Sequence, residues 1–169
     1  VEDQFVGAVT LALPDLIVPI GTLTTSDTEF SFGQNVTVDW TVANDGISPA
    51  AGSNWTDRVY LSLDTAPSSD DILLALFTNT LPLNPGESYD RSEDVALPLL
   101  DGLEAGIYHL LIQTDANQQI GESDENNAFA SGPLQITFPP LVDLLPTAIT
   151  GPATGQPLQQ QTFTWTVIN

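Results

Sequence analysis

The sequence predicts an all-β fold, a sandwich of about seven antiparallel strands. Apolar residues recur at every second position rather than with the 3.6-residue period of a helix. The 13 Pro and 12 Gly fall mostly between these alternating segments, where they favour turns. The segment 99–105 carries some helix formers, but it is short and is interrupted by Gly102. We therefore expect very little helix.

The alternating segments follow one another along the chain. Val36, Val38, Trp40 and Val42 alternate with polar residues, which places Trp40 on the buried face of a strand. A turn follows at 44–46, where Asn, Asp and Gly come together. The other strands are expected at 59–63, 73–80, 95–97, 107–114 and 129–138. Turns at this spacing are typical of a two-sheet sandwich.

Two short segments recur in the same order, which indicates a tandem repeat. WTVAN at Trp40–Asn44 returns as WTVIN at Trp165–Asn169, an offset of 125, and Asp15 is echoed by Asp143, an offset of 128. Trp165, like Trp40, is expected in a core because its neighbours are polar. The predicted units are the final strand of a preceding repeat at 1–13, a complete sandwich at 14–138 and the truncated start of the next repeat at 139–169.

The charge balance bounds the environment and the partners. The chain has 22 acidic residues against two Arg and no Lys, a formal charge of −20. Such a chain repels nucleic acid and anionic lipid, so neither is an expected partner. Self-repulsion of this size favours a salty or calcium-rich exterior, and we expect a secreted or cell-surface location. No apolar run of about 18 residues occurs, so no membrane insertion is expected in this segment.

From Trp55 to Asp64 the sequence reads WTDRVYLSLD, and further motifs follow in a consistent order. They are DILL at 71–74, LNPGESY at 83–89, GIYHL at 106–110, DAN at 115–117 and ESDENN at 122–127. Together they resemble the CARDB domain, the cell-adhesion-related domain found in bacteria, over roughly residues 14–138. The resemblance implies a fibronectin-type-III-like or immunoglobulin-like sandwich, usually repeated in large secreted or surface proteins.

The inventory of reactive side chains argues against an enzyme. The chain has one His, no Cys and no Lys. His109 lies between Tyr108 and Leu110 in a strand pattern, without the spacing of a catalytic or metal-binding motif, and is interpreted as a strand-face residue. Paired carboxylates such as Asp70 and Asp71 lack the cleft that glycoside hydrolysis requires.

Calcium is the predicted cofactor, because two loops are rich in the oxygen ligands that this ion prefers. The candidate ligands in these loops are Asp64, Asp70, Asp71, Asp115, Asn117, Glu122 and Asp124. Neither loop has the Gly and acidic spacing of the twelve-residue helix–loop–helix calcium motif. The alternative is that these side chains bond their own backbone and form Asx turns.

Arg58 is one of the two cations, and it lies within the segment most typical of the family. We predict a structural ion pair between Arg58 and Glu122 or Glu125, with a ligand-binding arginine as the alternative.

Two functions remain open from the sequence. The first is a structural or adhesive repeat whose partners are neighbouring repeats, with self-assembly into a filament and a surface glycan or protein as further partners. The second is a carbohydrate- or protein-binding accessory module of an extracellular enzyme, which an exposed aromatic such as Trp55 would support.

Overall fold

A computed structural model describes residues 11–80, 82–140 and 142–169. The chain divides into two compact units, Val1–Phe138 and Pro139–Asn169, which we describe separately. The predicted strand at 1–13 lies outside the described residues except for 11–13, which belong to no strand. No helix occurs in the described ranges, so none there is long and apolar enough to cross a membrane. This agrees with the low helix content expected from the sequence.

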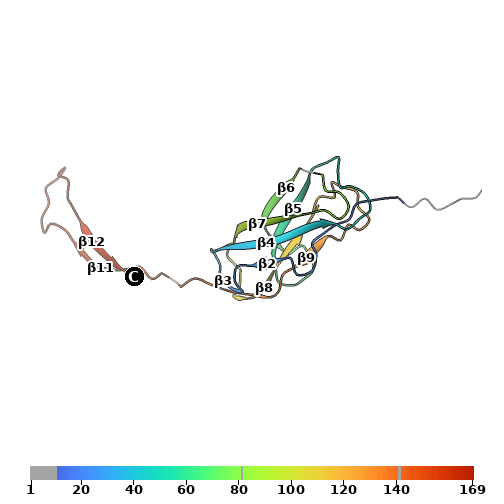
Figure 1. Ribbon diagram of the computed structural model, residues 1–169. Coiled ribbons are helices and arrows are strands. Elements are labelled where there is room, and N and C mark those ends of the chain that lie inside the picture. Colours follow the sequence, from blue (N-terminus) through green and yellow to red (C-terminus); the bar gives the residue numbers. More distant parts are fainter. Residues whose placement is uncertain (1–10, 81, 141) are drawn as a thin grey trace, which may run out of the picture. The chain divides into compact units, whose positions relative to one another are not determined.

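The first sheet of the larger unit is built around one long strand, β4 (Asn35–Asn44). β1 (Leu16–Ile17) and β2 (Thr24–Thr25) pair with β4, and β7 (Ser88–Ala96) pairs with it over its whole length. All three pairings are antiparallel. β4 therefore organises this layer (Figure 1).

The second sheet has the order β3-β10-β8-β5-β6, with β9 also paired to β8. Its strands are β3 (Glu29–Ser31), β5 (Trp55–Ser62), β6 (Ile72–Asn79), β8 (Gly106–Gln113), β9 (Ala128–Ala130) and β10 (Leu134–Thr137). Its pairings are antiparallel except for β10 with β3. The two sheets form the all-β sandwich that the sequence predicted.

The core lies between these sheets and follows from period-two alternation. On β4, Val38, Trp40 and Val42 are at most 1% exposed, while the residues between them are partly accessible. On β5, Trp55 and Val59 are buried in the same way. These residues belong to one continuous apolar cluster with contributions from both sheets, so their burial stabilises the contact between the layers.

Two strand predictions needed correction. The segment 129–138 is not one strand, because Ser131 and Gly132 separate β9 from β10. β7 begins at Ser88 rather than near Val95, and most of its residues are polar or charged. The apolar pattern misses β7 because β4 is its one paired neighbour and much of it faces solvent, where charges discourage further pairing.

The smaller unit contains a single hairpin. β11 (Leu145–Thr150) pairs antiparallel with β12 (Thr164–Ile168), with an irregularity in register between Pro146 and Ala148. Every residue of both strands is exposed. The expectation that Trp165 is buried is therefore wrong for the unit as it stands, since this side chain is 68% exposed. Two strands alone cannot cover their own apolar side chains.

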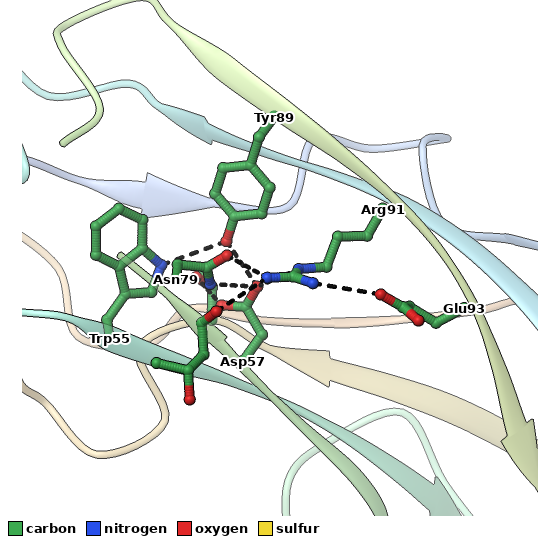
Figure 2. A network of polar contacts seen from close by, with 8 residues as sticks. Trp55, Asp57, Asn79, Tyr89, Arg91 and Glu93 are labelled. Atoms are coloured by element: carbon green, nitrogen blue, oxygen red, sulfur yellow. Dashed lines mark hydrogen bonds and ion pairs between the residues drawn. The ribbon is translucent and has the colours of Figure 1, made fainter. Parts of the chain in front are cut away.

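Asp57 on β5 has a buried carboxylate that is hydrogen-bonded to residues of both sheets (Figure 2). It accepts hydrogen bonds from the Tyr89 hydroxyl (2.6 Å) on β7, the Asn79 amide (2.9 Å) on β6 and the Thr114 hydroxyl (2.8 Å) after β8. The guanidinium of Arg91, also on β7, lies 3.8 Å from the same carboxylate. Both sheets and four strand segments thus meet at one side chain.

Aromatic rings surround this network. The Arg91 guanidinium lies 5.3 Å from the centroid of the Phe77 ring and 5.8 Å from that of Tyr89. The Trp55 indole N–H donates to the Tyr89 hydroxyl at 3.3 Å. Burial raises the pKa of Asp57, while the bond from Tyr89 opposes that shift most strongly. The carboxylate is thus held by donors and by a cation at once.

We predict that Asp57→Ala lowers the free energy of unfolding by about 3–5 kcal/mol, because it leaves a partly buried cation and several donors without their common partner. Urea denaturation of the full chain measures this change. The matched control is Asp94→Ala on β7, an exposed carboxylate, for which we expect a change within about 0.5 kcal/mol. Equal effects of the two substitutions would contradict a special role for Asp57.

Candidate metal centre

The loop between β8 and β9 is shaped by Asp115. Its backbone has a φ of 39°, an uncommon conformation that Asp adopts more readily than most residues. Its carboxylate accepts hydrogen bonds from the backbone N–H groups of Gln119 (2.9 Å) and Ile120 (2.7 Å). Ile120 is 5% exposed and anchors the loop in the core. The turn therefore places the Asp115 carboxylate inside the loop.

Glu122, in the same loop, is 7% exposed and binds the start of the sandwich. Its Oε2 accepts from the backbone N–H of Leu16 on β1 (2.6 Å) and from the side chain of Asn127 (2.8 Å). Its other oxygen, Oε1, is buried and has no hydrogen-bond partner. A buried carboxylate oxygen without a partner carries a large desolvation cost unless a proton or a cation meets it.

Glu122 faces two more carboxylates. Ligand oxygens of Asp115, Glu122 and Glu125 all lie within 4.8 Å of one another. Asp115 and Glu122 are buried and Glu125 is exposed, so the cluster lies at the edge of the fold with one side open to solvent. Glu125 also accepts a hydrogen bond from the backbone N–H of Glu122 (3.0 Å), which holds it beside the cluster.

The three carboxylates of this cluster would repel one another if all of them were ionised. Burial raises the pKa of Glu122 to about 8, and the charges of Asp115 and Glu125 act in the same direction. Burial also raises the pKa of Asp115, again with a contribution from Glu125. Repulsion between like charges in a poorly solvated place produces such shifts, and a bound cation would reverse them.

The residues present fit a hard divalent cation. Carboxylate oxygens are the ligands that Ca²⁺ and Mg²⁺ prefer, and three of them converge here. The Oε1 of Glu122 would gain from such an ion, because it is buried and has no hydrogen-bond partner. The loop backbone and water would supply the other oxygens.

The structure distributes the other predicted ligands elsewhere. Among the described residues, the cluster just defined is the one group of three or more His, Cys, Asp or Glu side chains at ligand spacing. Asp64 and Asp71 accept from backbone N–H groups of their own loop, and Asp70 accepts from the Ser68 hydroxyl. Asp124 accepts from the backbone and side chain of Asn126. These four side chains have the turn-forming geometry that was the alternative to calcium binding.

Arg58 does not form the predicted ion pair with Glu122 or Glu125. Its guanidinium donates to the side chains of Asn117 and Tyr60, and the ion pairs of the described residues are made by Arg91. The reason is the direction of the side chain. Arg58 alternates with the buried residues of β5, whereas Glu122 is buried beside Leu16. Asn117, expected as a metal ligand, is thus an acceptor for Arg58.

His109 has a structural contact of the kind expected from its strand position. Its Nδ1 lies 3.1 Å from the backbone carbonyl of Ser131, at the end of β9. The hydroxyl of Ser131 accepts from the backbone N–H of Leu110, so the two residues join β8 to the segment after β9. The histidine therefore belongs to the sheet and not to the acidic cluster.

The sequence model of the CARDB family matches residues 13–131. The chain is similar in structure to the CARDB domain of the PF1109 protein from Pyrococcus furiosus, crystallised in complex with di-metal ions, with a TM-score of 0.53 and 18% identity. That match covers 78% of this chain and 100% of the other.

A solution structure of the same Pyrococcus furiosus domain gives a TM-score of 0.52 at 18% identity, covering 76% of this chain and 100% of the other. At this identity the likeness concerns the fold. Among curated proteins no relative is found. The sequence match spans most of the chain and coincides with the sandwich that contains both carboxylate sites. The chain therefore belongs, over residues 13–131, to the CARDB family of immunoglobulin-like, non-catalytic modules.

Proposed function

We propose that this chain is a non-catalytic structural and adhesive module, repeated along a large secreted or cell-surface protein, and that Ca²⁺ bound in the β8–β9 loop makes it rigid. The observation that carries this proposal is the buried Oε1 of Glu122, which has no hydrogen-bond partner, in a residue that lies at ligand spacing from Asp115 and Glu125. The Pyrococcus furiosus domain, which was crystallised with two metal ions, supports a metal-binding role for this fold.

Calcium is favoured over magnesium by the kind of site. Ca²⁺ takes six to eight oxygens in irregular geometry, whereas Mg²⁺ requires a near-ideal octahedron and keeps several waters. The ligands Asp115, Glu122 and Glu125 come from one short loop with an open side, which suits the less demanding ion. An exterior rich in calcium would also reduce the repulsion within a chain of charge −20.

The proposed mechanical role follows from the hydrogen bonds between this loop and the first residues of the sandwich. Glu122 accepts a hydrogen bond from the backbone N–H of Leu16, and the backbone N–H of Ser123 donates to the carbonyl of Pro14 at 2.9 Å. The cluster therefore fastens the segment at which the chain enters the sandwich. A cation that fixes Glu122 would stiffen the junction between this module and whatever precedes it, as an adhesive stalk or filament requires. Neighbouring repeats are the partners that we propose first.

A binding function is the second candidate, and a groove of about 900 Å³ beside Tyr89 and Arg91 favours it. This groove lies over the network of Figure 2 and is also lined by Trp55. The indole is 1% exposed and donates its N–H to Tyr89, so it does not present a flat face to a sugar. The groove thus supports a small-molecule or peptide partner less strongly than the cluster supports a cation.

We predict that saturating Ca²⁺ raises the Tm of the full chain by about 5–10 °C over the calcium-free protein, because an ion bound only to the folded state adds its binding free energy to stability. Differential scanning calorimetry at matched ionic strength measures this shift.

Two variants separate site binding from general charge screening. Glu122→Gln should abolish the calcium shift, whereas Asp70→Asn, in the other acidic loop, should retain it. An unchanged shift in Glu122→Gln would refute the assignment of the site, since the ion would then act through the −20 charge of the whole chain.

We also predict that the calcium-free protein loses stability as the pH rises from about 4.5 to about 8. The pKa of Glu122 is raised from 4.5 to about 8, so the folded state binds more protons than the unfolded state within this window. Stability is then highest below the lower value and is lost as the pH passes the upper one, by up to about 5 kcal/mol.

Urea denaturation at several pH values measures this dependence. Glu122→Gln should flatten the profile between pH 6 and 8, because its amide does not titrate. Calcium should flatten it too, since the ion favours the ionised carboxylate. A wild-type profile that rises with pH in calcium-free buffer would contradict the prediction.

A further inference from the structure

The hairpin at 139–169 exposes an apolar face that a stable protein would cover. Trp165 and Val167 are on the same side of β12 and are 68% and 43% exposed, and Phe163, directly before this strand, is 57% exposed. Ile149, on β11, pairs with Trp165 and is 73% exposed. Adjacent large apolar side chains at such exposure mark a surface that binds another part of a protein.

The pairing register of this hairpin reproduces that of β1, β2 and β4. In the sandwich Ile17 pairs with Ala43, and in the hairpin Leu145 pairs with Ile168, which are their counterparts at offsets of 128 and 125. Because a one-residue slip would turn every side chain to the other face, a shared register is a stringent correspondence.

The correspondence also includes β2, although the segment between the counterparts of β1 and β2 is shorter in the hairpin. Thr24 pairs with Asp39 in the sandwich, and Thr150 pairs with Thr164 in the hairpin, where Thr164 is the counterpart of Asp39. Asp39 lies in the middle of β4, and Thr164 is the first residue of β12. The hairpin therefore matches β1 and β2 together on one side and β4 on the other.

A side-chain hydrogen bond is also reproduced. In the sandwich the backbone N–H of Asp15 donates to Oδ1 of Asn44 at 3.1 Å. In the hairpin the backbone N–H of Asp143 donates to Oδ1 of Asn169 at 3.3 Å. Asp143 and Asn169 are the counterparts of Asp15 and Asn44 in the sequence echo. A contact of this kind does not follow from strand alternation alone.

The two copies differ in what covers the apolar face. Trp40 is 1% exposed, and its counterpart Trp165 is 68% exposed. Val42 is fully buried, and its counterpart Val167 is 43% exposed. In the sandwich the cover is the second sheet, whose β5 and β8 contribute to the same apolar cluster. The hairpin has the counterparts of β1, β2 and β4, without that of β7 and without the second sheet.

We infer that residues 139–169 form the opening hairpin of a second sandwich, and that their apolar face binds the sheet of that second copy equivalent to β3, β5, β6, β8, β9 and β10. This inference rests on the repeat arrangement proposed above and is independent of calcium. The partner is thus a chain segment equivalent to residues 45–138, with an apolar inner face that alternates with polar residues.

The equivalence also specifies polar contacts for this partner. The Asn44 side chain donates to the carbonyls of Ser48 and Leu83, so that of Asn169 should donate to the matching carbonyls of the covering segment. The backbone N–H of Leu16 donates to Glu122, so that of Leu144 should meet a carboxylate in the equivalent loop. These contacts distinguish a second sandwich from a nonspecific apolar surface.

The test supplies the missing sheet from this chain. A variant in which residues 45–138 are repeated directly after Asn169 places that segment where it follows Asn44 in the sandwich. Hydrogen exchange measured by mass spectrometry follows β12, whose peptide sequence differs from that of β4. We expect exchange at 164–168 to slow by at least about a hundredfold relative to the original chain.

Two substitutions in the extended variant serve as a matched pair. Trp165→Asp places a charge on the face to be covered and should restore fast exchange in β12. Thr166→Asp places the same charge on the opposite face and should leave the protection intact. Protection in the extended variant that is lost in the first substitution and kept in the second supports the inference.

Two results would overturn it. The first is unprotected β12 in the extended variant while β4 of the original sandwich remains protected. The second is protection of β12 in the original chain that disappears on dilution together with a dimer in sedimentation, which would make another hairpin the partner.

A second variant controls for a mismatch between the two copies. In it, residues 142–169 replace residues 14–44 ahead of 45–138, and we expect a single sandwich that folds cooperatively. Loss of the calcium shift alone would affect only the metal proposal.

Discussion

The sandwich depends on one buried charge, the carboxylate of Asp57. Apolar burial brings the two sheets together but does not by itself set how they are aligned, because contacts between alternating apolar faces are not directional. The bonds from Tyr89, Asn79 and Thr114 are directional, and they reach Asp57 from both layers. Arg91 compensates the charge from the same strand as Tyr89. The cost of burying Asp57 is thereby offset only when the strands are correctly placed.

Glu122 is the opposite case, and the contrast separates a structural carboxylate from a ligand. Both side chains are buried acids of the same sandwich. Asp57 has donors for both oxygens and a guanidinium beside it, whereas Glu122 has one unpartnered oxygen and two carboxylates nearby. A buried group that the protein leaves incompletely satisfied is the kind that an ion from solution can complete.

The strand pattern was predictable because burial on one face of a sheet imposes period two, and β4 and β5 follow it closely. Asp57 was also detectable, since it shares the alternating positions of Trp55 and Val59. β7 was largely missed because an exposed edge strand carries no apolar signal. The sequence did not show that Arg91 rather than Arg58 forms the ion pairs, since this depends on which face of each strand meets the core. Glu125 joined the cluster through a turn whose direction no local pattern specifies.

The positions of the two arginines leave the acidic cluster without a cationic side chain. Arg91 compensates Asp57, and Arg58 donates to the neutral Asn117 and Tyr60. The chain has no Lys, so it holds no further arginine or lysine for Asp115 and Glu122. Neutralisation of Glu122 then comes from solution, as a proton below its raised pKa of about 8 or, in our proposal, as a metal ion that displaces this proton. Because Glu122 also holds Leu16, the state of this cluster controls how firmly the chain is fixed where it enters the fold. In the proposed function, the acidic composition of the chain and a rigid junction would therefore depend on the same supply of cations.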